Sequence, residues 1–438
     1  MDQDLKRLHN LGIHVPDILL PKTHVDLSKW AVVACDQYTS EPEYWQEIDD
    51  LVDDHPSTLR LIYPEVYLHD ENRNSRIDSI NETMRAYLDA DLFDTYHNAF
   101  FLVNRKTPKG LSRWGLMINL DLEFYDYNKT SRSLIRATEE TIESRIPPRK
   151  QIRKDSSLEL PHVMILFNDP TKSIIEPLSK SVDSYTQLYC TTLMGNGGTI
   201  TTYLIPSHKV VKQLADAFDS LYEKLDPQNR LLFAMGDGNH SLATAKSCWN
   251  SIKEGLTKEE IKDHPARFAL VEIENIFDEG LLFEAIHRLL SNTSRSQFFG
   301  VLNTLTESYT ITEYDNILDL TSILEQENSI QRFGYIDEEM TALVTLEKPS
   351  ASICAETIQI LIDKLLEQGS EVDYVHGFDV PFTLGKKEGN IGLIMPSISK
   401  DTFFDAILDM GSFPRKTFSL GEANEKRFYL EARKIVPT

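Results

Sequence analysis

Short apolar runs alternate with amphipathic stretches along the chain, a pattern typical of mixed α/β proteins. Hydrophobic residues spaced three and four apart predict helices, and shorter continuous apolar runs predict buried strands. The expected helices cover 210–225, 239–252, 355–367 and a stretch near 399–409, and the expected strands cover 30–35, 99–103, 114–122, 163–167, 231–235, 268–276 and 391–395. The expected fold class is therefore α/β, with mixed sheets and helices.

Length predicts two or three domains, because 438 residues are present and a domain averages about 150. A polar, charge-rich stretch near 125–160 is the best place for a boundary. We expect an N-terminal α/β region over 1–125, a central region over 126–290, and a C-terminal α+β region over 291–438.

Charge and composition narrow the class of partner. The chain has 45 Lys and Arg against 68 Asp and Glu, a net charge of −23, which argues against binding to nucleic acid. No apolar run approaches the roughly 20 residues of a membrane span, and the start of the chain lacks the pattern of a signal peptide. The four cysteines lie far apart, without the spacing of a zinc or disulfide site. We expect a cytoplasmic protein without membrane or nucleic-acid partners, and the oligomeric state stays open.

The segment 231–246 is the most informative for chemistry. Its pattern predicts a buried strand, then a Gly-Asp-Gly turn, and then a helix that begins directly after the turn. Gly236 and Gly238 permit positive φ and a close approach of a ligand to the backbone. The N–H groups at the helix start favour an anion, and the side chains of Asn239–Ser241 can add donors. Asp237 can hold Mg²⁺ or accept a proton.

A purely structural reading of this turn has equal weight at this point, because Asp and Asn are also common helix N-caps. The turn is not a Walker loop, since no Gly-Lys-Ser/Thr follows, and it is not Gly-x-Gly-x-x-Gly. Asp36 is a second candidate, because it follows the first expected strand, where α/β proteins place catalytic groups. A solvated turn carboxylate is the alternative there.

Histidines outside the turn are weaker candidates for metal-ligating or anion-binding residues. Glu284 and His287 have the spacing of a helical metal half-site, but di-iron bundles need two such motifs and this sequence has one. His287 with Arg288 is better explained as an anion clamp. The remaining histidines have no supporting pattern and are expected to be surface or structural; they include His24, His162, His208 and His264.

Asp237-Gly-Asn-His240, followed by Ala243-Thr-Ala245, resembles the Asp-Gly-His-His-Arg-x-x-x-Ala hallmark of the domain-of-unknown-function 1015 family of bacteria and archaea. Further elements resemble that family in the same order, so the resemblance spans nearly the whole chain. These elements are Cys35-Asp-Gln-Tyr38, Arg136–Thr141, Gly280-Leu281, His287-Arg288, His376-Gly377 and Phe413-Pro-Arg-Lys-Thr417.

Through its hallmark the family is similar to the ParB, sulfiredoxin and free-serine-kinase superfamily, in which this turn binds nucleotide phosphates. The resemblance implies a ParB/sulfiredoxin-like core elaborated by additional α+β regions. Asn239 stands where sulfiredoxin has its cysteine, and the arginines of ParB are missing. The kinase version is closest, but Asn239 replaces its first His and Ser241 its Arg. A phosphate cation is therefore missing unless Lys246, Arg288 or Lys416 supplies it.

The resemblance implies a small-molecule phosphotransferase that uses ATP or ADP with Mg²⁺ on a small polar or phosphorylated metabolite, such as serine or phosphoserine. A non-catalytic nucleotide- or phospho-ligand-binding sensor is the alternative, and a phosphatase is the third. The expected catalytic residues are Asp36, Asp237 (also the metal ligand) and His240, and the expected nucleotide-binding residues are Gly236, Gly238, Asn239, Ser241, His287, Arg288 and Lys416.

Overall fold

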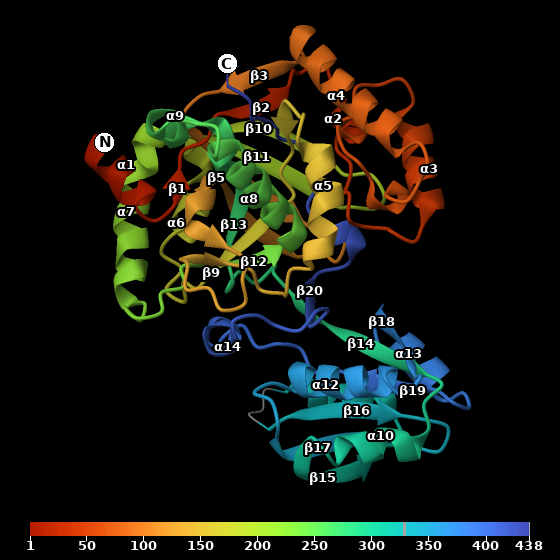
Figure 1. Cartoon of the computed structure of the whole chain (residues 1–438). Helices are drawn as coiled ribbons and strands as arrows, with labels where there is room; N and C mark the ends of the chain where they lie inside the picture. Colours follow the sequence, from red (N-terminus) through yellow and green to blue (C-terminus); the bar gives the residue numbers. More distant parts are fainter. Residues whose placement is uncertain (327–329, 438) are drawn as a thin grey trace. The chain divides into compact units, whose positions relative to one another are not determined.

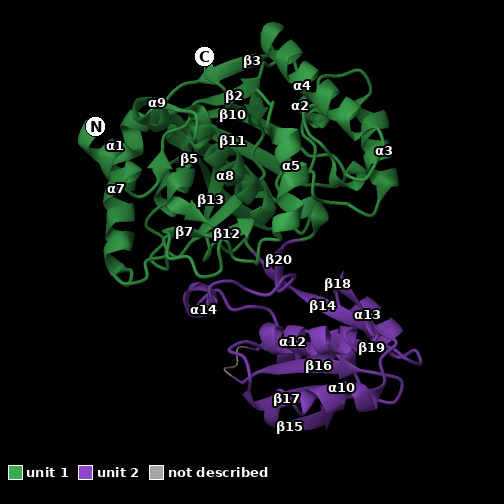
Figure 2. Cartoon of the chain, viewed as in Figure 1, with its two compact units in different colours: residues 1–281, 422–438 green, residues 282–421 purple. Residues whose placement is uncertain are grey.

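The chain forms two compact units in a computed structural model that describes residues 1–326 and 330–437. Unit 1 comprises residues 1–281 and 422–438, and unit 2 comprises residues 282–421 (Figure 2). The structure thus groups the chain differently from the three expected regions 1–125, 126–290 and 291–438. Strand 112–121 pairs with strand 268–275 across the expected break at 125, and the C-terminal segment returns to unit 1.

Unit 1 is built on one mixed sheet. Its strands in spatial order are β10 (Thr186–Thr192), β11 (Thr199–Pro206), β4 (Ala99–Lys106), β5 (Ser112–Asp121), β13 (Phe268–Asn275), β9 (Met164–Phe167), β12 (Phe233–Asp237), β7 (Ile135–Arg136) and β6 (Tyr125–Asp126), and β1 (Ile13–His14) pairs with β5. Neighbours are antiparallel except β13 with β9, β12 with β7 and β7 with β6. Phe100 and Leu102 enter one core and Phe101 and Val103 the other, so both faces are buried.

Helices cover both faces of this sheet (Figure 1). One core includes side chains of α1 (Asp2–His9), α7 (Ser207–Lys224) and α8 (Asn239–Lys253), and the other includes side chains of α2 (Leu27–Trp30), α3 (Pro42–Val52) and α4 (Arg73–Asp89). The second core also takes in the C-terminal segment Phe428–Ala432. The remaining α-helices of unit 1 are α5 (Ile146–Arg153), α6 (Glu176–Ser179) and α9 (Lys258–Asp263), of which α5 packs on α8. Its remaining strands form two separate pairs, β2 (Ile18–Pro21) with β3 (Phe93–Tyr96) and β8 (Leu158–Glu159) with β21 (Arg433–Lys434).

The strand expected at 30–35 is wrong. Residues Leu27–Trp30 form α2, whose start is capped by the Asp26 side chain accepting from Ser28 N. Beyond α2 the run makes one isolated antiparallel bridge, between Val33 and Phe428, and forms no strand. The apolar run is buried by packing in the second core rather than by a strand ladder, and apolar composition alone does not distinguish these two environments.

Unit 2 contains an antiparallel sheet with helices against it. Its strands in spatial order are β15 (Thr306–Glu313), β17 (Thr341–Pro349), β16 (Arg332–Ile336), β19 (Ile391–Ile394), β14 (Phe283–Ser291) and β18 (Glu371–His376), and β20 (Phe418–Leu420) also pairs with β14. Its helices are α10 (Arg295–Leu302), α11 (Ile317–Leu324), α12 (Cys354–Leu366), α13 (Asp379–Gly385) and α14 (Phe403–Met410). Glu284 and His287 lie in β14, so a helical metal half-site there is wrong: residues three apart on a strand point to opposite faces.

The α/β fold class with mixed sheets is confirmed, as are the expected helices now seen as α7, α8, α12 and α14. The strands expected at 99–103 and 114–122 are also confirmed, as β4 and β5, which pair antiparallel. Over residues 1–326 and 330–437, no helix has both the length and the apolar character needed to cross a membrane.

Candidate functional site

The turn between β12 and α8 has the geometry expected from the sequence. A register shift between Met235 and Asp237 places a bulge at Gly236, and Gly238 adopts φ +81° as the residue before α8. A Cβ atom on Gly238 would lie 3.0 Å from Cγ2 of Val163, so glycine also permits the close packing there. The N-cap residue Gly238 has no side chain to cap the start of α8, and the first N–H groups of a helix have no acceptor within the helix.

Asp237 is bound on both carboxylate oxygens. Oδ1 accepts from the N–H of Gly238 at 2.9 Å, and Oδ2 lies 3.2 Å from Nζ of Lys426. Lys426 belongs to the C-terminal segment that returns to unit 1, and its side chain is only 9% exposed, against 20% for Asp237. This ion pair therefore brings one buried ammonium to the start of α8.

Asp36 interacts electrostatically with the same ammonium. Burial alone would raise the pKa of Asp36, but the positive charges of His162 and Lys426 and the amide of Gln37 together hold it below its ordinary value. The Gln37 amide donates to Oδ1 at 2.9 Å. Asp36 is thus a half-buried carboxylate that stays ionised at neutral pH.

Tyr429 links the neighbouring backbone to a histidine. Its hydroxyl accepts from the N–H of Cys35 at 3.1 Å and lies 3.0 Å from Nδ1 of His162. Burial and the nearby Cys35 and Asp36 raise the pKa of Tyr429 well above its ordinary value, so the phenol stays protonated. We call Asp36, His162, Asp237, Lys426 and Tyr429 the acid–base cluster.

A second ion pair borders the acid–base cluster. Arg149 of α5 donates to both carboxylate oxygens of Glu65, with Nε at 2.7 Å from Oε1. The N–H of Glu65 in turn donates to the carbonyl of Cys35 at 2.8 Å. Burial and the charge of Asp36 raise the pKa of Glu65, and Arg149 partly offsets them. This pair fixes the backbone that carries Asp36.

The polar side chains at the start of α8 hold a neighbouring segment. Asn239 Oδ1 accepts from the N–H of Thr138 at 3.2 Å, and Nε2 of His240 lies 3.4 Å from the N–H of Ile142. Ser241 is half-buried on the first turn. These contacts are structural, and binding of phosphate by Asn239, His240 and Ser241 stays a prediction.

The cations suggested to replace the missing arginine are used elsewhere. Lys246 donates to the carbonyl of Leu122 at 2.7 Å. Arg288 lies in unit 2, is fully buried, donates to the carbonyls of Ile286 and Lys416, and stacks over the ring of Tyr374.

His287 and Lys416 are likewise placed within unit 2. His287 is buried there and its Nδ1 accepts from the N–H of Met395 at 3.0 Å. The Lys416 side chain is exposed. The nucleotide-binding roles of Arg288, His287 and Lys416 stay predictions.

Sequence reasoning missed Lys426 and Tyr429 and expected His162 to be only surface or structural. None of the three belongs to a recognisable motif. The one usable signal is the apolar run Phe428–Leu430, which indicates that the C-terminal segment is buried against the fold. Across residues 1–326 and 330–437, no three His, Cys, Asp or Glu side chains are grouped so as to hold a metal ion, and Mg²⁺ at Asp237 stays a prediction.

Several solved structures resemble the chain weakly. Mutants of a free serine kinase in complex with AMP or with ADP match at 9% identity and a TM-score of 0.38, covering 73% of this chain and 92% of that one. A conserved hypothetical protein from Pyrococcus furiosus matches at 11% identity and a TM-score of 0.33, covering 72% and 90%. SbnI from Staphylococcus aureus, truncated at its C-terminus, matches at 8% identity and a TM-score of 0.33, covering 69% and 81%. At these TM-scores the likeness carries no inference about function or about a ParB/sulfiredoxin-like core.

No curated protein matches the sequence significantly. A family model described as "Protein of unknown function (DUF1015)" matches residues 19–366. The match includes Asp36, His162 and Asp237 of the acid–base cluster and ends before Lys426 and Tyr429. Because it covers well over half of the sequence, the chain belongs to the DUF1015 family.

Proposed function

We propose that the acid–base cluster is the active site of a phosphotransferase that moves a phosphoryl group from ATP or ADP to a small polar metabolite, serine being one candidate. The observation that carries the proposal is the position of Lys426. Its ammonium lies 3.2 Å from Asp237 at the uncapped start of α8 and lowers the pKa of Asp36. One cation therefore serves an anion-binding helix start and an ionised carboxylate together.

Asp36 is suited to be the general base. Phosphoryl transfer depends mainly on positioning and charge neutralisation, and in protein kinases an aspartate accepts the proton of the attacking hydroxyl. In the proposed step the metabolite oxygen bonds to the terminal phosphorus, and its proton passes to the Asp36 carboxylate. The bond from that phosphorus to the bridging oxygen breaks, and the shortened nucleotide leaves with the electron pair.

The remaining members of the cluster neutralise and position. Lys426 places positive charge beside the first N–H groups of α8, where phosphate oxygens would lie. Lys426 supplies the cation that Ser241 does not, which removes the difficulty posed by the missing arginine. Tyr429 orients His162 through its hydroxyl.

Mg²⁺ accompanies the nucleotide in this proposal. Mg²⁺ typically binds through one or two carboxylates, substrate phosphates and water, so Asp237 alone is a sufficient protein ligand. Its Oδ2 now faces Lys426, which would have to share that oxygen. The ion would neutralise charge on the transferred phosphoryl group.

The proposal includes a cytoplasmic location. It includes no nucleic-acid or membrane partner, because a net charge of −23 disfavours binding to polyanions and anionic surfaces.

A turnover assay tests the proposal. The protein is incubated with Mg²⁺, ATP or ADP, and a panel of small hydroxyl-bearing metabolites including serine, and phosphorylated product is followed by ³¹P NMR. We expect turnover by the wild type and a loss of about 100-fold or more in Asp36→Asn, since a general base contributes about 10²–10⁴. Asp54→Asn, which changes an exposed carboxylate after α3, is the matched control and should retain full activity.

Each alternative has its own outcome. Nucleotide binding without turnover on any metabolite identifies a sensor, and phosphate release from a phosphorylated metabolite without nucleotide identifies a phosphatase. Full activity in Asp36→Asn removes Asp36 from the chemistry. If Lys426→Met binds nucleotide as the wild type does, the Lys426–Asp237 pair is only structural.

A further inference from the structure

Two buried arginines lie directly opposite each other in the sheet of unit 1. Arg105 of β4 and Arg113 of β5 are register partners, and both side chains are buried. Like charges directly opposite one another on neighbouring strands are destabilising, and burial of each charge adds a desolvation cost. Burial and the charges of Arg113 and Arg427 lower the pKa of Arg105 to about 9. Apolar side chains would fill these two positions of the sheet at a lower cost, so the groups that the guanidiniums bind are informative.

Both guanidiniums bind the backbone that leads into Lys426. Arg105 donates to the carbonyl of Asn424 at 3.1 Å, and Arg113 donates to the carbonyl of Glu425 at 3.3 Å. Hydrogen bonds from a charged donor are about twice as strong as those between neutral groups. The two residues that precede Lys426 are therefore fixed to the sheet by their carbonyl oxygens.

The same segment is tied to the backbone that carries Asp36. The carbonyl of Arg427 accepts from the N–H of Ala34 at 2.9 Å, and the N–H of Tyr429 donates to the carbonyl of Val32 at 2.9 Å. The arginines hold the segment from the sheet, and these backbone bonds hold it from the run that leads into Asp36. The segment is thus fixed between the sheet and one of the two carboxylates of the acid–base cluster.

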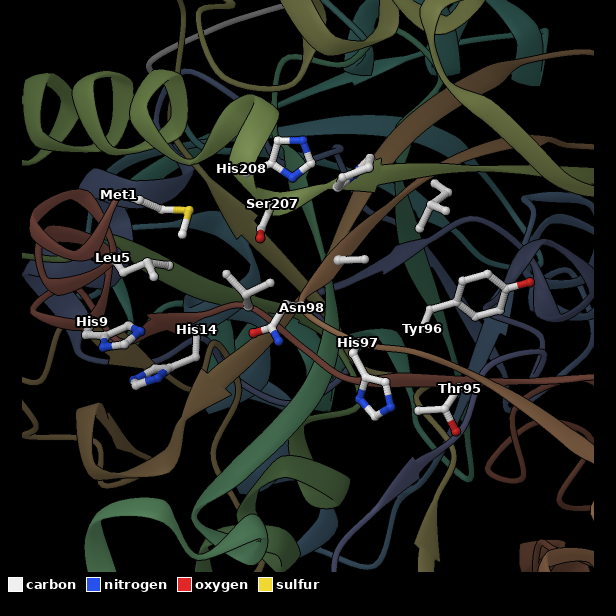
Figure 3. A pocket seen from close by; sticks show the side chains of 14 residues that line it. Met1, Leu5, His9, His14, Thr95, Tyr96, His97, Asn98, Ser207 and His208 are labelled. Atoms are coloured by element: carbon white, nitrogen blue, oxygen red, sulfur yellow. The ribbon is translucent and has the colours of Figure 1, made fainter.

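The burial of the two arginines keeps them away from a ligand. A cavity of about 780 Å³ in unit 1 is lined by residues of α1 and β1, the segment 95–99 and the junction between β11 and α7 (Figure 3). Neither Arg105 nor Arg113 is among its 14 lining residues. Since both side chains are buried against the C-terminal segment, they act on the acid–base cluster through the backbone that they hold.

We propose that Arg105 and Arg113 are positioning residues for Lys426. They fix the backbone before it, so that its ammonium reaches Asp237 at the start of α8. A lysine side chain is a flexible four-carbon stem, so its ammonium keeps one position only if the backbone that carries it is fixed. The inference deepens the proposed function, on which the role of Lys426 toward phosphate rests, but the placement of Lys426 is testable without turnover.

Acetylation of the full chain by N-hydroxysuccinimidyl acetate, followed by mass spectrometry, tests this placement. Arg113→Lys keeps a positive charge opposite Glu274, which lies 3.2 Å from Nε of Arg113, but loses the planar fork that also reaches the carbonyl of Glu425. We expect the acetylation rate of Lys426 to rise about tenfold, as for the loss of one hydrogen bond from a charged group. The rate is divided by that of Lys246, a half-buried lysine of unit 1, so that general loosening of the unit cancels.

Arg267→Lys is the matched control. Arg267 also pairs with a buried carboxylate, that of Asp121, and donates to a backbone carbonyl, that of Lys262 at 3.2 Å. Lys262 lies in α9 and not in the C-terminal segment, so this variant should leave the relative acetylation rate of Lys426 unchanged. Arg105→Lys should raise that rate as the first variant does.

Steady-state kinetics provide a second measurement. If Lys426 binds phosphate, Arg113→Lys should raise the KM for nucleotide about tenfold, whereas a smaller folded fraction lowers kcat and leaves KM unchanged. Faster acetylation with an unchanged KM would support the positioning and remove Lys426 from nucleotide binding.

The two proposals fail separately. The positioning role is overturned if neither arginine variant raises the relative acetylation rate of Lys426, or if Arg267→Lys raises it equally. Faster acetylation in the arginine variants of a protein without turnover would support the positioning and contradict the phosphotransferase. Turnover together with unchanged acetylation in both variants would support the phosphotransferase and overturn the positioning.

Discussion

The pairing of Lys426 with Asp237 can be measured as a coupling energy. Lys426→Met removes the ammonium and keeps a side chain of similar length, and Asp237→Asn removes the carboxylate charge while keeping an oxygen that accepts from Gly238 N. Lys426→Met removes the ammonium that Asp237 and Asp36 share, whereas Asp237→Asn leaves that ammonium with Asp36. The double variant removes both charges. Comparing all four proteins isolates the interaction between the two groups.

The magnitude follows from the geometry. At 3.2 Å and an effective dielectric constant of about 20, the Coulomb attraction is about 5 kcal/mol. Desolvation of the two groups offsets much of this attraction, since Lys426 is 9% and Asp237 20% exposed. We expect Lys426→Met to lower the free energy of unfolding by about 2–3 kcal/mol, because Asp36 and Asp237 then lose a shared cation, and the coupling energy to be about 1–3 kcal/mol.

Tryptophan fluorescence during urea unfolding measures this free energy selectively. The four tryptophans, Trp30, Trp45, Trp114 and Trp249, all lie in unit 1, which contains the pair. Unfolding of unit 2 therefore contributes no tryptophan signal of its own. A coupling energy below about 0.5 kcal/mol, with both single variants near wild-type stability, would refute the pairing and with it the cation assigned to the start of α8.

Two further predictions concern stability. Gly238→Ala should lower the free energy of unfolding of unit 1 by about 2 kcal/mol in the same fluorescence assay, because a Cβ is strained at φ +81° and meets Val163 at 3.0 Å. Gly110 also has φ +81° but nothing within 4 Å, so Gly110→Ala should show only the loss due to backbone strain. Equal losses in the two variants would show that the contact with Val163 contributes nothing. Burial lowers the pKa of His287 from 6.5 to about 4, so between pH 7 and 5 the unfolded state takes up a proton that the folded state does not. Acidification should therefore lower the stability of unit 2 by about 2 kcal/mol. Amide hydrogen exchange in β19, corrected for intrinsic rates, should show this loss in the wild type and much less of it in His287→Asn, and identical pH dependence in both would contradict it.

Local patterns in the sequence were sufficient for the elements and for the turn. Hydrophobic periodicity located α7, α8 and α12, and the Gly-Asp-Gly run located the turn and the positive φ of Gly238, because both depend on neighbours along the chain. The bulge at Gly236 was not predicted. The sequence failed at 30–35, where an apolar run is buried by tertiary packing without a strand ladder. The burial of Arg288 among backbone carbonyls of unit 2 likewise depends on tertiary packing, and no local pattern indicated it.

Tertiary structure alone decided which charges meet. Asp36 and Asp237 are 201 positions apart, and Lys426 lies a further 189 positions on, so no spacing rule connects them. They come together because residues 422–438 return to unit 1 and bury the run Phe428–Leu430 in its second core, which carries Lys426 to the start of α8. The cavity beside α7 arises in the same way, from α1, the segment 95–99 and the end of β11. Burial and long-range packing set the pKa values and the hydrogen-bond partners of these groups, and neither is encoded in the residues adjacent to them along the chain.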